Sequence, residues 1–238
     1  MSGGIMRPRV VCRHGSPTCR HGSPVVTGRP RPVASRLVAA EHYFTSTPTG
    51  PGRRRTVLVT LAGREVKVHT SGGVFSPAHV DTGTQVLLRE APPPPEDGTF
   101  LDLGCGWGPI ALSLALIRPE TTVYAVDVNE RARDLTRDNA AALELPGVVV
   151  ASPDEVADHV RFDLLWSNPP IRVGKPALHA MLEHWLPRLA PSGAAYLVVQ
   201  KNLGADSLQR WCSDELGMRC DRYAVAKGFR LLRVARDG

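Results

Sequence analysis

TFLDLGCGWGPIALSLALIRP, residues 99–119, places a short apolar strand directly before a glycine-rich turn and an apolar helix. Gly104, Gly106 and Gly108 would let the backbone approach a ligand closely at the N-terminus of that helix. Their G-x-G-x-G spacing differs from the G-x-G-x-x-G of dinucleotide-binding proteins. Asp102 lies at the strand end, where its charge would repel a pyrophosphate. The turn therefore predicts a ligand with an ammonium or sulfonium group.

The same strand–helix alternation continues along the chain. Apolar strands are expected at TVYAVDV, GVVVAS, FDLLWS and GAAYLVVQ, residues 122–128, 147–152, 162–167 and 193–200. Continuous apolar strands separated by helices indicate a mostly parallel sheet covered on both faces. The sequence predicts a doubly wound α/β domain with its ligand at the carboxyl ends of the strands.

Upstream segments suggest three parts. Residues 1–36 are rich in Pro, Gly, Ser and Arg and are predicted to be a disordered tail, whose CRHGSPT–CRHGSPV repeat is weak as a zinc site. Residues 37–98 hold a predicted hairpin over 56–70, a helix around 81–89 and a Pro-rich spacer. Residues 99–238 form the predicted ligand-binding domain. No metal site is expected.

Composition sets broad limits on class and location. The chain has 238 residues, 42% hydrophobic residues, a net charge of +6 and five cysteines without framework spacing. No apolar run reaches the roughly 20 residues of a membrane helix. Seven of the 29 Lys and Arg residues fall in the acid-free first 40, so the other 22 balance the 23 acids. We expect a cytoplasmic protein with free thiols and no membrane partner, and the charge only permits nucleic-acid binding.

Two further strand ends carry polar residues. Asp127 ends the strand after the glycine turn, where it could accept hydrogen bonds from ribose hydroxyls or cap the next helix. Together with the glycine turn, ribose binding is favoured. Ser152, after the following strand, could contact an adenine ring or cap a helix.

SNPPIRVGK, residues 167–175, ends the FDLLW strand with two prolines. Asn-Pro-Pro could be an ordinary turn, or a turn that holds carbonyl oxygens where a substrate docks.

These motifs resemble those of class I S-adenosylmethionine-dependent methyltransferases. DLGCGWGP and AVDVNE look like that class's first two motifs. GVFSPAHVDTGTQVLL, SNPPIRVGK and KGFRLLRV are similar to the "methyltransferase small" family, which includes small-subunit ribosomal RNA guanine-N2 methyltransferases. The resemblance covers about residues 37–236. It implies S-adenosyl-L-methionine as cofactor, structured RNA as partner, and Thr84 near the methionine end of the donor; it implies no oligomeric state.

Within that resemblance the Asn-Pro-Pro turn gains a chemical role. The Asn168 side-chain oxygen and the Pro169 carbonyl could bind both N–H groups of an exocyclic amine and aim its lone pair at the donor methyl. Pro170 and Ile171 complete the predicted catalytic turn. Ile171 offers apolar contact where many relatives have an aromatic ring. Phe75 or Trp107 could supply one instead, although packing in the core or against the cofactor is favoured for both. Five basic residues could hold phosphates or be solvated charges: Arg172, Lys175, Lys201, Lys227 and Arg230.

Several functions stay open at this stage. The leading hypothesis is methylation of guanine N2 in small-subunit ribosomal RNA. Adenine N6 or a protein glutamine would suit the same turn. Two alternatives come from other functional classes: a catalytically silent RNA-binding module with this fold, and an NAD dehydrogenase.

Overall fold

The computed structural model of the chain describes residues 54–236 except 73, 75, 77 and 78. The predicted tail with its Cys-His repeat, Arg53 and Phe75 lie outside these residues. All described residues fall in one compact unit. The boundary expected at residue 98 stays a prediction.

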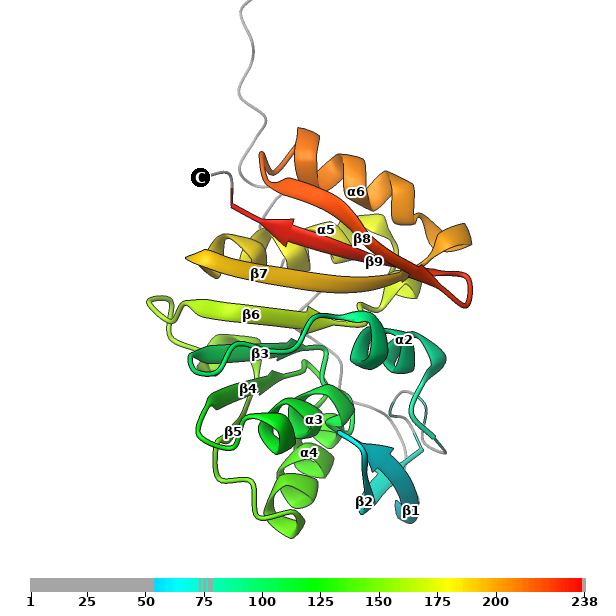
Figure 1. Cartoon of the computed structure of the whole chain (residues 1–238), viewed down its shortest axis with the longest axis vertical. Helices are drawn as coiled ribbons and strands as arrows, with labels where there is room; N and C mark the ends of the chain where they lie inside the picture. Colours follow the sequence, from blue (N-terminus) through cyan, green and yellow to red (C-terminus); the bar gives the residue numbers. More distant parts are fainter. Residues whose placement is uncertain (1–53, 73, 75, 77–78, 237–238) are drawn as a thin grey trace, which may run out of the picture. The chain divides into compact units, whose positions relative to one another are not determined.

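The centre of the fold is a seven-stranded sheet in the order β5-β4-β3-β6-β7-β9-β8 (Figure 1). Five strands pair in parallel: β3 (Thr99–Leu103), β4 (Thr122–Val126), β5 (Val148–Ala151), β6 (Phe162–Ser167) and β7 (Leu189–Gln200). β8 (Arg219–Ala226) and β9 (Phe229–Ala235) complete the sheet antiparallel. The strand order reverses between β3 and β6, which is where a doubly wound sheet opens a crevice at its carboxyl edge. The predicted doubly wound, mostly parallel sheet is confirmed.

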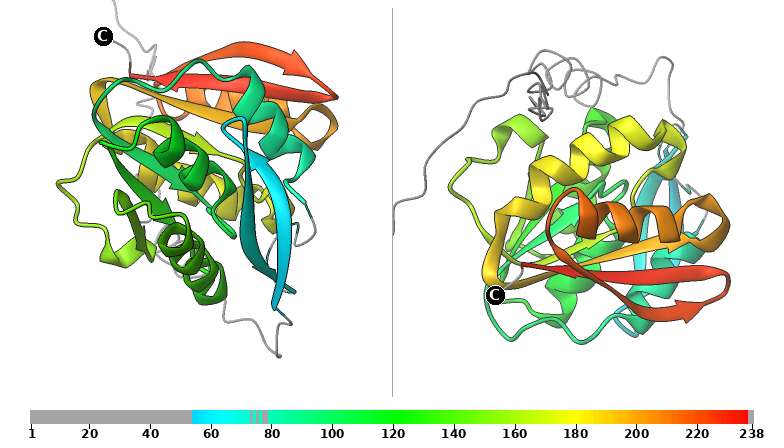
Figure 2. Two further views of the ribbon diagram at one scale, coloured as in Figure 1. Left: turned by 60° about the horizontal axis from the view of Figure 1, so that its bottom comes forward. Right: turned by 90° about the horizontal axis from the view of Figure 1, so that it is seen from above.

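Helices cover both faces of this sheet (Figures 1 and 2). Leu101 and Leu103 of β3 pack with α5 (Lys175–Trp185) and α6 (Ala205–Asp214). Phe100, directly before Leu101, points to the opposite face and packs with α2 (Thr82–Glu90) and α3 (Pro109–Ile117). This alternation follows from the two-residue period of a strand, and it explains why the parallel strands are apolar throughout.

A separate hairpin, β1 (Arg54–Leu61) and β2 (Arg64–Ser71), confirms the predicted β-rich element. Its two-residue turn, Ala62-Gly63, has positive φ at both positions, as expected for a tight hairpin. Val59, Leu61 and Val68 are buried against α3 and against α4 (Glu130–Ala142). The hairpin thus lies on the helices that follow the glycine turn.

The helix predicted around residues 81–89 is α2. The Asp81 carboxylate caps it by accepting from the backbone N–H groups of Gly83 and Thr84, at 2.7 and 3.3 Å. α2 ends at Ala91, since the proline that follows disfavours helical backbone. Among the described helices, none is long and apolar enough to cross a membrane.

Candidate active site

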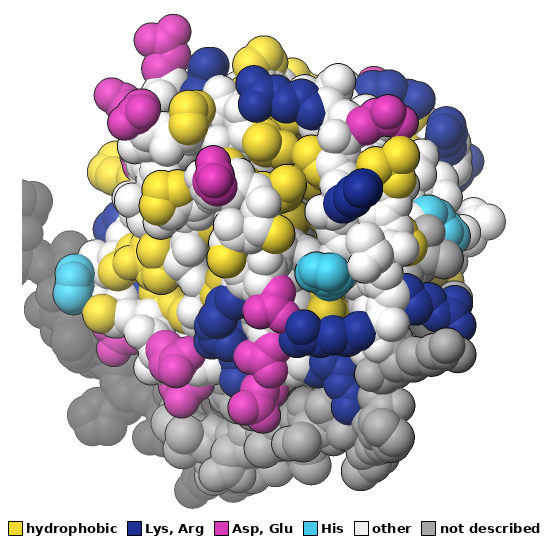
Figure 3. Space-filling model, turned by 90° about the horizontal axis from the view of Figure 1, so that it is seen from below, with side chains coloured by type: hydrophobic (Ala, Val, Ile, Leu, Met, Phe, Trp, Pro, Cys, Tyr) yellow, Lys and Arg dark blue, Asp and Glu magenta, His cyan; other side chains and the backbone are white. Residues whose placement is uncertain are grey.

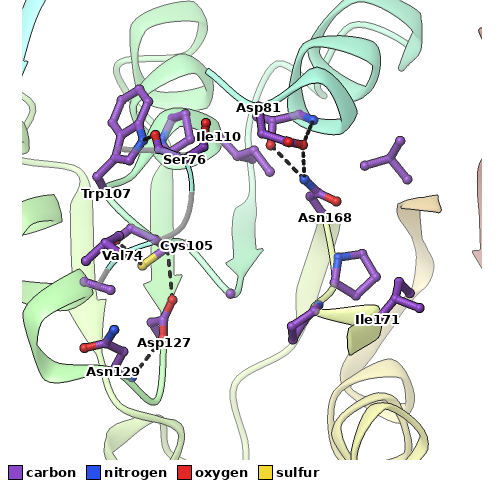
Figure 4. Close-up of a pocket in the computed structure, with 18 of the residues that line it drawn as sticks. Val74, Ser76, Asp81, Cys105, Trp107, Ile110, Asp127, Asn129, Asn168 and Ile171 are labelled. Atoms are coloured by element: carbon purple, nitrogen blue, oxygen red, sulfur yellow. Dashed lines mark hydrogen bonds between the residues drawn. The ribbon is translucent and has the colours of Figure 1, made fainter. Parts of the chain in front are cut away.

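A cavity of 520 Å³ lies at the carboxyl edge of the sheet, within the size range of small-molecule sites. Figure 4 shows its two sides. We call the Gly104–Gly108 turn and Asp127 the donor wall. We call a second set of lining residues the acceptor wall: Asn168, Pro169, Pro170, Ile171, Val173, Gln200, Leu203 and Phe229. Asp81 and Thr84 of the α2 start also line the cavity.

The glycine turn of the donor wall needs its glycines for two different reasons. Gly108 has φ +95°, and a Cβ there would lie 2.9 Å from Thr136 Cγ2 on α4. Gly104 has φ +79°, and a Cβ there would meet no atom within 4 Å. Gly104 and Gly106 line the cavity, whereas Gly108 is buried behind it. Two of the three predicted glycines therefore line the cavity.

Two buried side chains of α4 brace the turn from behind. The Thr136 hydroxyl donates to the Gly106 carbonyl at 3.0 Å. Asn139 donates from Nδ2 to the carbonyls of Trp107 and His69, at 2.9 and 3.0 Å, and its Oδ1 accepts the His69 N–H at 2.6 Å. One residue thus ties the glycine turn to the hairpin. Sequence reasoning missed both residues, although polar residues three apart on a buried helix face were a usable signal.

Asp127 shapes the donor wall with both carboxylate oxygens. Oδ2 accepts the Gly106 N–H at 2.9 Å and Oδ1 accepts the Asn129 N–H at 2.8 Å. Burial raises the pKa of the Asp127 carboxyl, and these hydrogen bonds oppose the shift. The capping role considered for Asp127 belongs to Asn129, which accepts from Arg131 N at the start of α4. Asp127 lines the cavity, so ribose binding stays a prediction for it.

Asp102 takes a different place from the one expected. Its side chain is fully buried, and Oδ2 accepts the Ala111 N–H of α3 at 2.9 Å. Burial raises the pKa of the Asp102 carboxyl to about 8, so it is largely protonated at neutral pH. Asp102 does not line the cavity. Asp81 and Asp127 supply the acidic groups there, and the described lining holds no Lys or Arg, which suits a cationic ligand better than a pyrophosphate.

Ser152 lies outside the cavity lining. It forms a capping box with Glu155, whose carboxylate accepts the Ser152 N–H at 2.7 Å, at the start of the short turn η1 (Pro153–Glu155). Two roles were predicted for Ser152. The structure shows the geometry of the helix cap, and contact with adenine stays a prediction.

Asn168, at the end of β6, is held in one orientation. Its Nδ2 donates to Asp81 Oδ2 at 2.8 Å and lies 3.1 Å from Thr84 Oγ1. A carboxylate accepts but does not donate, so the amide nitrogen must face Asp81. Oδ1 is therefore turned away from Asp81 (Figure 4), and no described residue donates to it. Sequence reasoning saw Asp81 only as a helix start and missed this second role.

The carbonyl oxygens of the two prolines, expected to be free for a substrate, both accept hydrogen bonds within the turn. The Pro169 carbonyl accepts the Ile171 N–H at 2.8 Å, which uses one of its two lone pairs. Pro170 is exposed, and its carbonyl accepts the Val173 N–H at 3.1 Å. These bonds form the short turn η2 (Ile171–Val173), with Ile171 packed against the α5 core. All four predicted catalytic residues line the cavity.

Trp107 is not available as a stacking platform. Its indole is 1% exposed in the core under the hairpin, and Nε1 donates to the Ser76 carbonyl at 3.3 Å. This is the core position that the sequence favoured for Trp107, and a base could reach the ring face only by displacing the hairpin packing.

The basic residues near the cavity divide into two groups. Arg230 is buried and paired with Asp206, which corrects its expected place on a phosphate-binding surface. Lys201 and Lys227 are exposed and have no ion pair among the described residues; the Lys201 N–H donates to the Gly228 carbonyl at 2.9 Å, which brings the two lysines together. Lys175 lies 3.2 Å from the Ser207 hydroxyl. The Arg172 side chain lies outside the described part.

The face seen from below mixes both signs of charge (Figure 3). Arg54 pairs with Asp138 at 2.6 Å, and Arg137 pairs with Asp134 at 2.8 Å. Exposed pairs of this kind leave little net field for a polyanion. The paired Arg54 at the start of β1 therefore gives an RNA contact at this end of the hairpin no support.

Known proteins resemble this chain to different extents. The Uncharacterized protein YbxB of Bacillus subtilis is 36% identical over 171 residues, which are 71% of this chain and 85% of that protein. Ribosomal RNA small subunit methyltransferase C of Aeromonas hydrophila is 36% identical over 122 residues, which are 51% of this chain and 35% of that protein. The chain thus spans about a third of the length of that second relative.

A solved structure shares the fold. It is the T. thermophilus 16S rRNA N2 G1207 methyltransferase (RsmC) in complex with AdoMet and guanosine, with a TM-score of 0.67 and 24% identity. The match covers 80% of this chain and 52% of that chain.

The family comparison covers most of the described residues. The model of the Methyltransferase small domain matches residues 65–233. The predicted methyltransferase class and the predicted cofactor, S-adenosylmethionine, agree with this match and are confirmed. The chain belongs to the methyltransferase small family.

Proposed function

We propose that the chain methylates the exocyclic N2 amine of a guanine in small-subunit ribosomal RNA. The observation that carries the proposal is the fixed Asn168 amide. Asp81 and Thr84 hold its nitrogen, so Oδ1 is left as a hydrogen-bond acceptor in the same cavity as the glycine turn and Asp127.

The donor wall suits S-adenosylmethionine, which supplies a methyl group on a sulfonium sulfur when bound. A Cβ on Gly104 would meet no atom within 4 Å, so the backbone there is open to a ligand. Asp127 lines the same cavity, and its carboxylate would accept hydrogen bonds from the ribose hydroxyls. Asp81 and Asp127 give the cavity the negative charge that a cationic donor requires.

The acceptor wall would position the nucleophile. The Asn168 Oδ1 and the remaining lone pair of the Pro169 carbonyl would each accept one amine N–H and direct the nitrogen lone pair at the methyl group. Both acceptors also stabilise the positive charge that develops on the nitrogen. Beside Asn168 the described lining has no Lys or His. The one carboxylate there, Asp81, already accepts hydrogen bonds from Asn168 and Gly83. We therefore propose that the proton leaves to solvent after methyl transfer.

Ribosomal RNA as the substrate rests on two supports. Several relatives bear the name ribosomal RNA small subunit methyltransferase C. The exposed Lys201 and Lys227, beside the acceptor wall, are placed to meet phosphates next to the target base.

The test uses tritiated S-adenosylmethionine with an in vitro transcript of small-subunit ribosomal RNA, which carries no earlier methylation. The transcript is offered naked and assembled with small-subunit proteins, and labelled RNA is digested to nucleosides. Label in N2-methylguanosine is expected. Label in N6-methyladenosine would overturn the guanine target, and label only in a glutamine peptide would overturn the RNA substrate.

Donor binding is measured in parallel to exclude a silent module. S-adenosylhomocysteine in hundredfold excess over a micromolar Kd should raise the unfolding free energy by about 2.7 kcal/mol. A shift with NADH but none with S-adenosylhomocysteine would overturn the proposal in favour of a dehydrogenase. No shift with either at millimolar ligand would favour a module that has lost catalysis.

A further inference from the structure

We propose that Phe229 is the platform on which the acceptor stacks, so that the cavity selects a planar aromatic base over an amide side chain. This inference rests on the proposed function and extends it to the residue that orients the base.

Phe229 stands where the acceptor must enter. It begins β9 and pairs with Gln200 at the carboxyl end of β7, one strand away from the β6 end that carries Asn168. The ring is partly buried and lines the cavity. It packs on one side against the core under α2, which fixes its position.

Gly83 places the ring next to the amide. A Cβ on Gly83 would lie 3.1 Å from Phe229 Cε1 and 3.1 Å from Asn168 Nδ2. The ring edge and the amide nitrogen thus both lie against Gly83. In the proposed complex the ring extends from there beside the base whose amine is bound by Asn168 Oδ1.

The rest of the lining gives no alternative ring. Trp107 and Phe229 are the aromatic residues among the described lining residues, and Trp107 is fixed in the core. The acceptor wall also contributes the apolar side chains of Ile171, Val173 and Leu203, of which Val173 and Leu203 are 54% and 46% exposed. An apolar slot with one aromatic wall fits the face of a base, for which aromatic stacking is typically worth about 1–3 kcal/mol. An amide side chain has no ring face to use it.

The experiment compares four proteins on the RNA transcript that accepts label: wild type, Phe229→Leu, Phe229→Tyr and Tyr223→Leu. Leucine keeps an apolar side chain but removes the ring. Tyr223 is 45% exposed on β8 and controls for loss of an aromatic residue elsewhere on the sheet. KM for RNA, kcat and the Kd of S-adenosylhomocysteine are measured for each.

Phe229→Leu should raise KM for RNA about tenfold, with donor Kd unchanged. Phe229→Tyr and Tyr223→Leu should stay within about twofold of wild type. If wild type labels RNA and Phe229→Leu keeps the wild-type KM, the platform is wrong while the proposed function stands. If wild type labels a glutamine peptide and no RNA, both fail together. Equal losses with leucine and tyrosine would show a packing role and overturn the platform.

Discussion

The two walls of the cavity are built in opposite ways. In the donor wall, polar groups are paired within the protein. Asp127 accepts hydrogen bonds from two backbone N–H groups. Thr136 and Asn139 donate hydrogen bonds to carbonyls of the glycine turn. In the acceptor wall, Asn168 is held on one side only, and Pro170, Val173 and Leu203 face solvent. A braced wall preserves the shape of a constant ligand, whereas an open wall admits a large substrate.

This contrast separates the effects of substitution. A change in the donor wall removes bonds that the fold itself uses, so it should appear as lost stability. A change in the acceptor wall removes groups that only a substrate uses, so it should appear as lost turnover in a stable protein.

The largest effect is expected for Asn139→Ala. It leaves the His69 N–H, the His69 carbonyl and the Trp107 carbonyl without their buried partner. Since each unpaired buried group typically costs about 1–3 kcal/mol, we expect a loss of about 3 kcal/mol in unfolding free energy. Urea unfolding measures it, with the exposed Asn202→Ala as the matched control. A loss below about 1 kcal/mol would show that the position of the hairpin does not depend on the hydrogen bonds of Asn139.

Asn168→Ala should reverse that pattern. The variant keeps the backbone of the turn, so Tm and the affinity for S-adenosylhomocysteine should stay near wild type. Methyl transfer should fall on the order of a hundredfold, the usual cost of removing one positioned polar group. Single-turnover rates with saturating donor report this directly. Turnover close to wild type would mean that Asn168 only ends the strand, and the contrast between the walls would disappear.

Gly83→Ala probes the contact between α2 and the acceptor wall. Alanine favours a helix over glycine by about 1 kcal/mol, yet its Cβ would lie 3.0 Å from Asp81 Oδ2 and must push on Asn168 and Phe229. We expect turnover to fall about tenfold while Tm changes little. Gly72→Ala, whose Cβ would meet no atom within 4 Å, is the control. A clear loss of Tm with unchanged turnover would show that the crowding is absorbed by the fold rather than by the site.

The same contrast explains what the sequence could predict. The donor wall follows two short motifs at the ends of consecutive strands, so Gly104, Gly106 and Asp127 could be placed by their position at strand ends. The acceptor wall and the start of α2 bring together Asp81, Thr84, Asn168 and Phe229, which are far apart in the chain and meet only when α2 docks on β7 and β9. No local pattern marks Phe229 as a cavity residue, since a Phe that begins a strand usually packs in the core.

Asp102 shows the limit of reading charge from sequence. The strand end was correctly placed, but burial decides whether its carboxyl is charged, and burial depends on how α3 packs over it. A pKa raised to about 8 in the folded protein, against about 3.9 when unfolded, means that the folded state holds the proton more tightly. This contribution to stability is complete below pH 4 and is lost as the pH rises towards 8.

Asp102→Asn tests that reasoning through the pH dependence of stability, which changes by at most about 1.4 kcal/mol per pH unit for one proton. Asparagine can still accept the Ala111 N–H but stays neutral, so the variant should gain stability relative to wild type as pH rises from 5 to 8 and level off above. Unfolding free energies across this range measure the gain, with the exposed Asp214→Asn as the control. A flat difference would mean that Asp102 is already ionised. If Asp102→Asn also weakened S-adenosylhomocysteine binding at pH 7, the buried carboxyl would act on the donor through the glycine turn, and the donor wall would share its groups between fold and ligand.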